Sequence, residues 1–289
     1  MSNRAVWGEY RVERRWLLSL VVAVLVAIVG IGLGPWARSQ AAVGRTELIW
    51  YGQSAFKVTT PAGNVLLFDP WLKNPANPQG QAVLDGLDRA DLLLVTHGHG
   101  DHVGDAVTIA QKTKAKLVAS YDLGNAMVAH LGYPKEQFGF DATGNFGGKI
   151  SLLNGDVEVA FVPAVHSSTV TTDGNPQPFF AGNPGGFWVK IKNGPTFYHT
   201  GDTDLFGDMN LISQFGPVDY MLACIGGKFT MGPDRAAMAV KLVNPKVVVP
   251  MHFGLFSLPG TPEQFAAALK NQSAAAPMKL MQVGVPERI

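Results

Sequence analysis

Residues 92–102 read Leu-Leu-Leu-Val-Thr-His-Gly-His-Gly-Asp-His, and this stretch decides the fold. Its first four residues form an apolar run typical of a buried strand, and the glycines that follow mark a loop. The loop carries four candidate metal ligands, which are His97, His99, Asp101 and His102. Imidazoles and a carboxylate crowded at a strand end suit zinc, and also iron or manganese. Because three of the seven histidines in the chain fall in this hexamer, a polar loop without a metal role is a poor explanation.

Three further candidate ligands also follow apolar, strand-like runs. They are His166 after 161–165, Asp202 after 196–199, and His252 after 247–251. Taken alone, each is better explained as a satisfied polar residue at a strand end. Together with the hexamer they make five imidazoles and two carboxylates, which is what two adjacent cations need if one carboxylate bridges them.

Five segments of the chain resemble the metal motifs of a known family. The segments are 96–105, 163–168, 198–203, 229–233 and 250–252. They resemble the metallo-β-lactamase superfamily, most closely its uncharacterised metal-dependent hydrolase branch, which is related to the ascorbate-phosphate lactonases. The resemblance extends from residue 48 to the C-terminal helix. It implies an α/β fold, a four-layer αββα sandwich with a dinuclear metal site at one edge of the sheets.

The resemblance also implies a role for each ligand. One divalent metal ion would be held by His97, His99 and His166, the second by Asp101, His102 and His252, and Asp202 would bridge them. Zinc is expected at both positions, and the ligand types also accommodate manganese and iron. Asp101 would be catalytic as well, because a carboxylate beside a bound water can orient the attacking hydroxide. No serine or cysteine nucleophile is then required.

The function expected from this site is that of a dinuclear metal-dependent hydrolase. Metal-bound hydroxide would attack an ester-like bond in a small-molecule substrate, such as a lactone, a phosphodiester or an amide. Two alternatives stay open, a di-iron redox protein on the same fold and a non-catalytic metal-binding scaffold. The redox relatives tend to replace one histidine of the hexamer by a carboxylate and to carry a flavin partner domain, and this sequence has neither feature.

The composition indicates a folded body with a large apolar core. Hydrophobic residues make up 47% and charged residues 16% of the 289 residues, which allows one or two domains. The formal charge is +1, and because 1–41 holds five arginines and two glutamates, the remainder carries −2. A slightly acidic body without a basic run argues against nucleic acid as a partner. The single cysteine, Cys224, lies in an apolar run and is expected to be a buried, inert thiol.

Residues 17–34 form a stretch of eighteen residues without a charge. As a helix it would be about 27 Å long, close to the roughly 30 Å core of a bilayer. Arg11, Arg14 and Arg15 precede it and a tryptophan flanks each end, which predicts a membrane anchor with a periplasmic body. A signal peptide cleaved after 39–41 is the alternative, and it also exports the body. We therefore expect a membrane segment and linker over 1–41, and the hydrolase domain over 42–289.

The remaining pattern predicts the layers of the fold. Strands are expected at 48–51, 55–59, 65–68, 92–95, 116–119, 157–162, 186–191, 196–199, 220–224 and 247–250. Helices are expected at 105–112, 125–131, 233–242 and 262–270. The strands come first in hairpin-like succession and then alternate with helices. Helices should therefore cover two sheets that pack on each other.

Three polar residues outside the ligand set have predicted roles. Asp69 ends a strand near the site, and it is either an acceptor for a ligand imidazole N–H or a simple turn cap. His199 is expected to pack beneath the site. His130 lies in an apolar helix far from the motifs and is expected to be structural.

Two positions depart from the family pattern. Gln53 stands where a histidine is usual, and the pair 226–227 is Gly-Gly where Gly-Asp is usual. Both changes are expected to alter the substrate pocket without touching the seven ligands. Substrate specificity is expected to reside in loops such as 73–80 and 171–185.

Overall fold

The computed structural model describes residues 45–172 and 174–289. The predicted membrane segment at 17–34 lies outside these residues. Within the described ranges, no helix combines the length and the apolar character needed to cross a bilayer.

Seven strands form the first sheet, and their pairing is mixed. In spatial order they are β15 (Glu287–Arg288), β1 (Glu47–Trp50), β2 (Phe56–Thr59), β3 (Val65–Phe68), β4 (Leu92–Leu94), β5 (Lys116–Ser120) and β6 (Thr143–Gly144). Pairing is antiparallel from β15 to β3 and parallel from β3 to β6. Because parallel strands end at the same edge, the loops that follow β3 and β4 lie side by side.

Six strands form the second sheet, which is mixed in the same way. In spatial order they are β14 (Val247–Met251), β13 (Tyr220–Cys224), β12 (Thr196–His199), β11 (Gly185–Ile191), β8 (Val157–Pro163) and β7 (Lys149–Leu152). The pairs among β7, β8, β11 and β12 are antiparallel, whereas β12, β13 and β14 run parallel. The carboxyl ends of β12, β13 and β14 therefore also share one edge.

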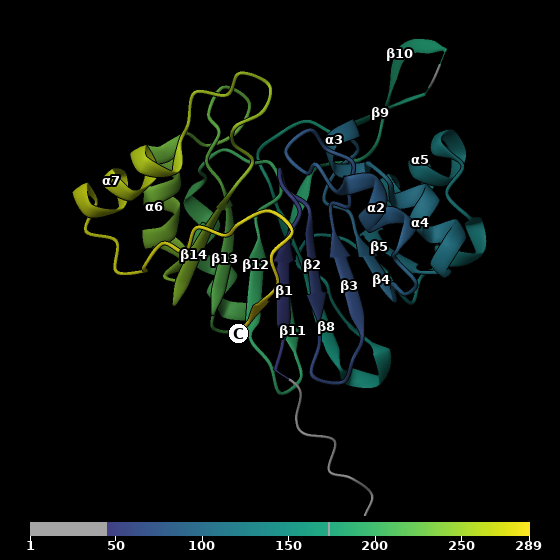
Figure 1. Ribbon diagram of the computed structural model, residues 1–289, viewed down its shortest axis with the longest axis horizontal. Coiled ribbons are helices and arrows are strands. Elements are labelled where there is room, and N and C mark those ends of the chain that lie inside the picture. Colours follow the sequence, from purple (N-terminus) through teal and green to yellow (C-terminus); the bar gives the residue numbers. More distant parts are fainter. Residues whose placement is uncertain (1–44, 173) are drawn as a thin grey trace, which may run out of the picture. The chain divides into compact units, whose positions relative to one another are not determined.

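Helices cover the outer faces of the two sheets, and Figure 1 shows α6 and α7 on one side and α2, α4 and α5 on the other. The helices are α2 (Gly80–Asp85), α3 (Gly100–Val103), α4 (Ala106–Thr113), α5 (Tyr121–Leu131), α6 (Pro233–Val243) and α7 (Pro262–Asn271), with 3₁₀ turns η1 (Lys135–Gln137), η2 (Leu153–Gly155) and η3 (Gly207–Phe215). The described residues thus adopt the αββα sandwich that the sequence predicts.

The β4 strand shows why the sheets stack in this way. Leu92 and Leu94 belong to the core between the two sheets, whereas Leu93 and Val95 pack toward the helices. Side chains alternate between the two faces of a strand, so a run that is apolar at every position buries both faces. Polar side chains such as His97 therefore lie in the loop that follows the strand.

A small hairpin, β9 (Thr169–Thr172) and β10 (Asn175–Phe180), projects beyond the sheets (Figure 1). The ring of Phe179 in β10 stacks on His130 of α5, with ring centroids 3.8 Å apart and planes 9° apart. This contact agrees with the structural role predicted for His130, since the imidazole holds the hairpin to the helix.

Candidate metal centre

The seven predicted ligands come together at the shared edge of the sheets. Four of them lie in the segment directly after β4. The one-turn helix α3 begins directly after His99 and brings Asp101 and His102 back toward the end of the strand. The other three follow β8, β12 and β14. Their ligand atoms form three overlapping groups, each within 4.8 Å: His97, His99 and His166; His97, His102 and Asp202; and Asp101, His102 and His252.

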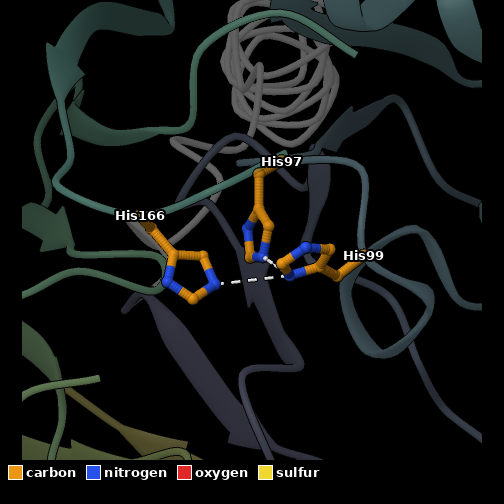
Figure 2. Close-up of side chains that lie close together, drawn as sticks. All are labelled: His97, His99 and His166. Carbon is orange, nitrogen blue, oxygen red and sulfur yellow. Dashed lines mark hydrogen bonds between the residues drawn. The ribbon is translucent and has the colours of Figure 1, made fainter. Parts of the chain in front are cut away.

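The first group consists of three imidazoles that point toward one another (Figure 2). Nδ1 of His99 lies 3.0 Å from Nε2 of His97 and 3.3 Å from Nε2 of His166. Burial lowers the pKa of all three rings, and neighbouring imidazoles add to this effect. The rings are therefore neutral at neutral pH, and their converging lone pairs form an arrangement that a cation stabilises.

The group of Asp101, His102 and His252, called the second group below, adds a carboxylate to two imidazoles. Oδ2 of Asp101 lies 3.6 Å from Nε2 of His102 and 3.4 Å from Nε2 of His252. Burial opposes the charge on both rings, but the carboxylates of Asp202 and Asp101 outweigh it and raise the pKa of His252 to about 9. The pKa of His102 is raised in the same way. A cation that binds to this group therefore displaces protons from the imidazoles.

Asp202 lies between the two groups. Its Oδ2 is 2.9 Å from Nε2 of His252 and 3.7 Å from Nε2 of His166, and its Oδ1 is 3.3 Å from Nε2 of His102. One buried carboxylate thus approaches histidines of both groups.

Several buried atoms at this point have no hydrogen-bond partner. They are Nε2 of His102, Oδ1 of Asp202 and both ring nitrogens of His252. The ion-pair distances around them are short, yet the directions do not satisfy a hydrogen bond. Buried polar atoms are almost always paired, because an unpaired one costs about 1–3 kcal/mol. The donor set therefore fits a bound cation better than it fits a network of hydrogen bonds.

Residues 64–253 match the family described as a β-lactamase superfamily domain. The UPF0173 metal-dependent hydrolase of Thermodesulfovibrio yellowstonii is 55% identical over 251 residues, which are 86% of this chain and 94% of that protein. The chain belongs to the β-lactamase superfamily and, within it, to the UPF0173 metal-dependent hydrolases. A second UPF0173 metal-dependent hydrolase, from Anaeromyxobacter dehalogenans, is 53% identical over 253 residues, which are 86% of this chain and 89% of that protein.

The solved structure of Igni18, a metallo hydrolase from the archaeon Ignicoccus hospitalis, has the same fold as this UPF0173 family member. Its TM-score is 0.71 at 31% sequence identity, and the match covers 84% of this chain and 99% of that chain. The predicted resemblance to the metallo-β-lactamase superfamily is thus confirmed by sequence and by fold.

In this family member, Asp69 supports ligands of both groups. Its Oδ2 accepts hydrogen bonds from Nδ1 of His102 at 2.7 Å and from Oγ1 of Thr96 at 2.8 Å. The Thr96 hydroxyl then accepts from Nδ1 of His97 at 3.0 Å. Both imidazoles thus carry their proton on Nδ1 and turn Nε2 toward the centre. Of the two roles considered for Asp69, the structure favours the acceptor.

Three residues at the centre have a left-handed backbone without being glycine. They are Gln53 (φ 49°), Asp69 (φ 40°) and His252 (φ 55°). Such conformations cost roughly 1–3 kcal/mol each and persist where the surroundings fix them, often at functional sites. Here the backbone carbonyl of Gln53 accepts a hydrogen bond from the backbone N–H of His252 at 3.1 Å, and this bond joins two of the strained positions directly.

The prediction that Gln53 touches none of the ligands is wrong. The side chain is fully buried, and its Nε2 donates to Oδ2 of Asp101 at 3.2 Å. The residue at position 53 therefore contacts the candidate ligand Asp101 directly. At the other departure, Gly227 has φ of 72°, a left-handed backbone that favours glycine, and a Cβ there would lie 3.4 Å from Cγ of Pro259.

A cavity of about 390 Å³ opens over the centre. It is lined by His99, Asp101, His166, Ser167, Asp202, Phe229, His252 and Phe256. None of these residues falls in 73–80 or 171–185, so the described residues of the loops expected to set specificity do not line it. The sequence also gave no sign of Phe256, which belongs to no recognised motif.

Two predictions about buried residues agree with the structure. His199 is fully buried and packs beneath the site, where its Nε2 donates to the carbonyl oxygen of Ser54 at 3.0 Å. Its ring stacks on Phe68 with centroids 5.3 Å apart. Cys224 is fully buried, and burial raises the pKa of its thiol to about 11, which makes it a poor nucleophile.

Proposed function

We propose that this protein is a dinuclear hydrolase that cleaves an ester-like bond in a small molecule, such as a lactone, a phosphodiester or an amide. The observation that carries the proposal is the buried set of unpartnered donor atoms on His102, Asp202 and His252, next to three converging imidazoles. Membership in a family named for metal-dependent hydrolysis favours this function over the redox and scaffold alternatives.

We assign the ligands as the geometry groups them. One cation would be held by His97, His99 and His166, the other by Asp101, His102 and His252, with Asp202 between them. Zinc suits the five imidazoles and two carboxylates best. When bound, two adjacent cations supply Lewis acidity and lower the pKa of a shared water.

Asp101 is the residue we assign to proton handling. Both Asp101 and Asp202 line the cavity, but the side chain of Asp101 is 18% exposed whereas Asp202 is buried. Burial would raise the pKa of Asp101, but the imidazoles of His102 and His252 hold it below its ordinary value, so it is a carboxylate at neutral pH. Gln53, His102 and His252 all approach Oδ2, which leaves Oδ1 to accept a hydrogen bond from the attacking water.

Metal content tests the dinuclear assignment. Protein purified without chelators and supplied with zinc should contain about two metal ions per chain, because the seven ligands form two groups joined by one carboxylate. Elemental analysis measures this ratio directly. The variant His166→Ala should hold about one ion, since only one group loses a ligand, and His130→Ala should still hold two. A ratio near zero in zinc-supplemented protein would contradict the proposal.

We further propose that the hydrolase domain works outside the cytoplasm, attached to the membrane by residues 17–34. The proposal is supported by the charge-free stretch and by the three arginines before it. A C-terminal reporter that is active only in the cytoplasm should therefore stay silent in cells, whereas the same fusion lacking 1–41 should give a signal. A strong signal from the full-length fusion would reverse the assigned topology. Mass spectrometry of the mature N-terminus separates the two export routes, since cleavage would make residue 42 the first.

A further inference from the structure

Two large apolar side chains stand exposed at the rim of the catalytic cavity. Phe229 is 54% exposed and Phe256 is 50% exposed, and both line the cavity together with polar and metal-ligating residues. Side chains of this size are ordinarily buried, because each exposes a large apolar area to water. Exposed apolar surface beside a polar site is typical of a ligand-binding groove.

Both rings are held in place by their surroundings. The Phe256 ring stacks on Trp71, with centroids 6.0 Å apart and planes 8° apart. The Phe229 ring lies under Nζ of Lys228, which is 4.7 Å from its centroid. Each aromatic residue therefore has a partner on one side, lines the cavity, and still exposes about half of its surface.

The backbone that presents these rings is strained. Phe256 and Ser257 both have φ of 55°, and Lys228, directly before Phe229, has φ of 58°. For bulky residues a left-handed backbone is unusual, and it is retained where the surroundings enforce it, often at ligand-binding segments. Burial of the two rings does not account for this strain, because neither ring is buried.

We propose that Phe256 and Phe229 form an aromatic subsite, which binds a planar aromatic ring carried by the substrate next to the bond that is cleaved. This inference rests on the proposed function and names the substrate class of the same site. The parallel stack of Trp71 on Phe256 favours a flat ring over an aliphatic group, since a further ring can extend the stack. The cavity of about 390 Å³ is large enough for such a group beside the reacting atoms.

The test compares three carboxylates that differ only in their apolar part: acetate, cyclohexylacetate and phenylacetate. Their dissociation constants are measured by calorimetry on full-length, zinc-supplied protein. Phenylacetate should bind roughly tenfold more tightly than acetate, with cyclohexylacetate between them. In Phe256→Ala the advantage of phenylacetate over acetate should fall by roughly three- to tenfold, and Phe229→Ala should act in the same direction.

Two further variants make the test specific. Phe256→Leu keeps apolar surface without a ring, so it should retain binding of cyclohexylacetate and lose the added preference for phenylacetate. Phe140→Ala removes a ring that is 83% exposed but does not line the cavity, and it should leave all three constants unchanged.

Equal binding of acetate and phenylacetate by the unaltered protein would overturn the subsite, and so would a phenylacetate preference that survives in both alanine variants. Cyclohexylacetate binding as tightly as phenylacetate would overturn the assignment of an aromatic ring. A different result would contradict the hydrolase proposal: metal-loaded protein would cleave no ester, lactone, phosphodiester or amide. That result would leave the binding ratios unaffected.

Discussion

Replacing Asp101 by alanine should lower the rate of hydrolysis by about 10²–10⁴-fold, the contribution typical of a positioned proton acceptor. The variant loses the more exposed of the two carboxylates that line the cavity, which is also one ligand of the second group. The fold should persist, because Asp101 lies in the one-turn helix α3 and belongs to neither hydrophobic core. The measurements are kcat/KM on the substrate found, metal content, and the midpoint of thermal unfolding.

His130→Ala is the matched control for this prediction. It also removes a polar side chain from a helix, but its ring stacks on Phe179 and lies in none of the ligand groups. Its turnover per folded molecule should equal that of the unaltered protein. Near-full activity of the Asp101→Ala variant would show that the assigned mechanism is wrong, even if two metals are bound.

The helices that the sequence predicts well are those with strong start signals. The helices expected at 233–242 and 262–270 are observed as Pro233–Val243 and Pro262–Asn271, and each has proline in its first turn. The helix expected at 125–131 begins earlier, at Tyr121. The glycine in its first turn weakens the local signal, but a Cβ on Gly124 would lie 2.0 Å from the ring of Phe138, so tertiary packing requires that glycine.

Two strands that the sequence misses, β7 and β10, have weak local signals, although each pairs with a strand adjacent in the sequence. The β10 strand contains two prolines in the run Asn-Pro-Gln-Pro-Phe-Phe, which argues against a strand, yet it pairs with β9 and its Phe179 stacks on α5. The β7 strand is an edge strand of four residues, Lys-Ile-Ser-Leu, in which only Leu152 is buried, so its alternation of polar and apolar residues is short and weak. The stack of Phe179 on His130 of α5 joins residues far apart in the chain, so it cannot be read from a local run of residues.

The same distinction applies to the site. The seven candidate ligands could be predicted because each follows an apolar strand, and strand ends converge in a mixed sheet. The hydrogen bond from Gln53 to Asp101 joins residues 48 positions apart, and the stack of Trp71 on Phe256 joins two loops that share no motif. Such contacts are set by how the loops pack on each other, which local sequence does not encode.

Replacing Asp69 by asparagine should weaken metal binding by about 10–100-fold, the range typical for loss of a partner that orients a ligand. The carboxylate accepts three hydrogen bonds, from Nδ1 of His102 and from the hydroxyl and backbone N–H of Thr96. Asparagine has one acceptor oxygen, so its NH₂ group must face at least one of these donors. The carboxylates of Asp202, Asp69 and Asp101 together raise the pKa of His102, and the substitution removes one of these three negative charges. Competition with a chromophoric zinc chelator measures the dissociation constant.

Asp156→Asn is the control, because Asp156 is another buried carboxylate with strong local contacts away from the centre. It accepts from Oγ1 of Thr60 and Nδ2 of Asn64, both at 2.7 Å. Both variants should lower the midpoint of thermal unfolding, since each leaves buried donors without an acceptor. Only Asp69→Asn should change the zinc dissociation constant, because only Asp69 is bonded to a ligand. If the two variants bound zinc equally well, Asp69 would be a turn cap alone, and the orientation of His97 and His102 would have to come from the cations themselves.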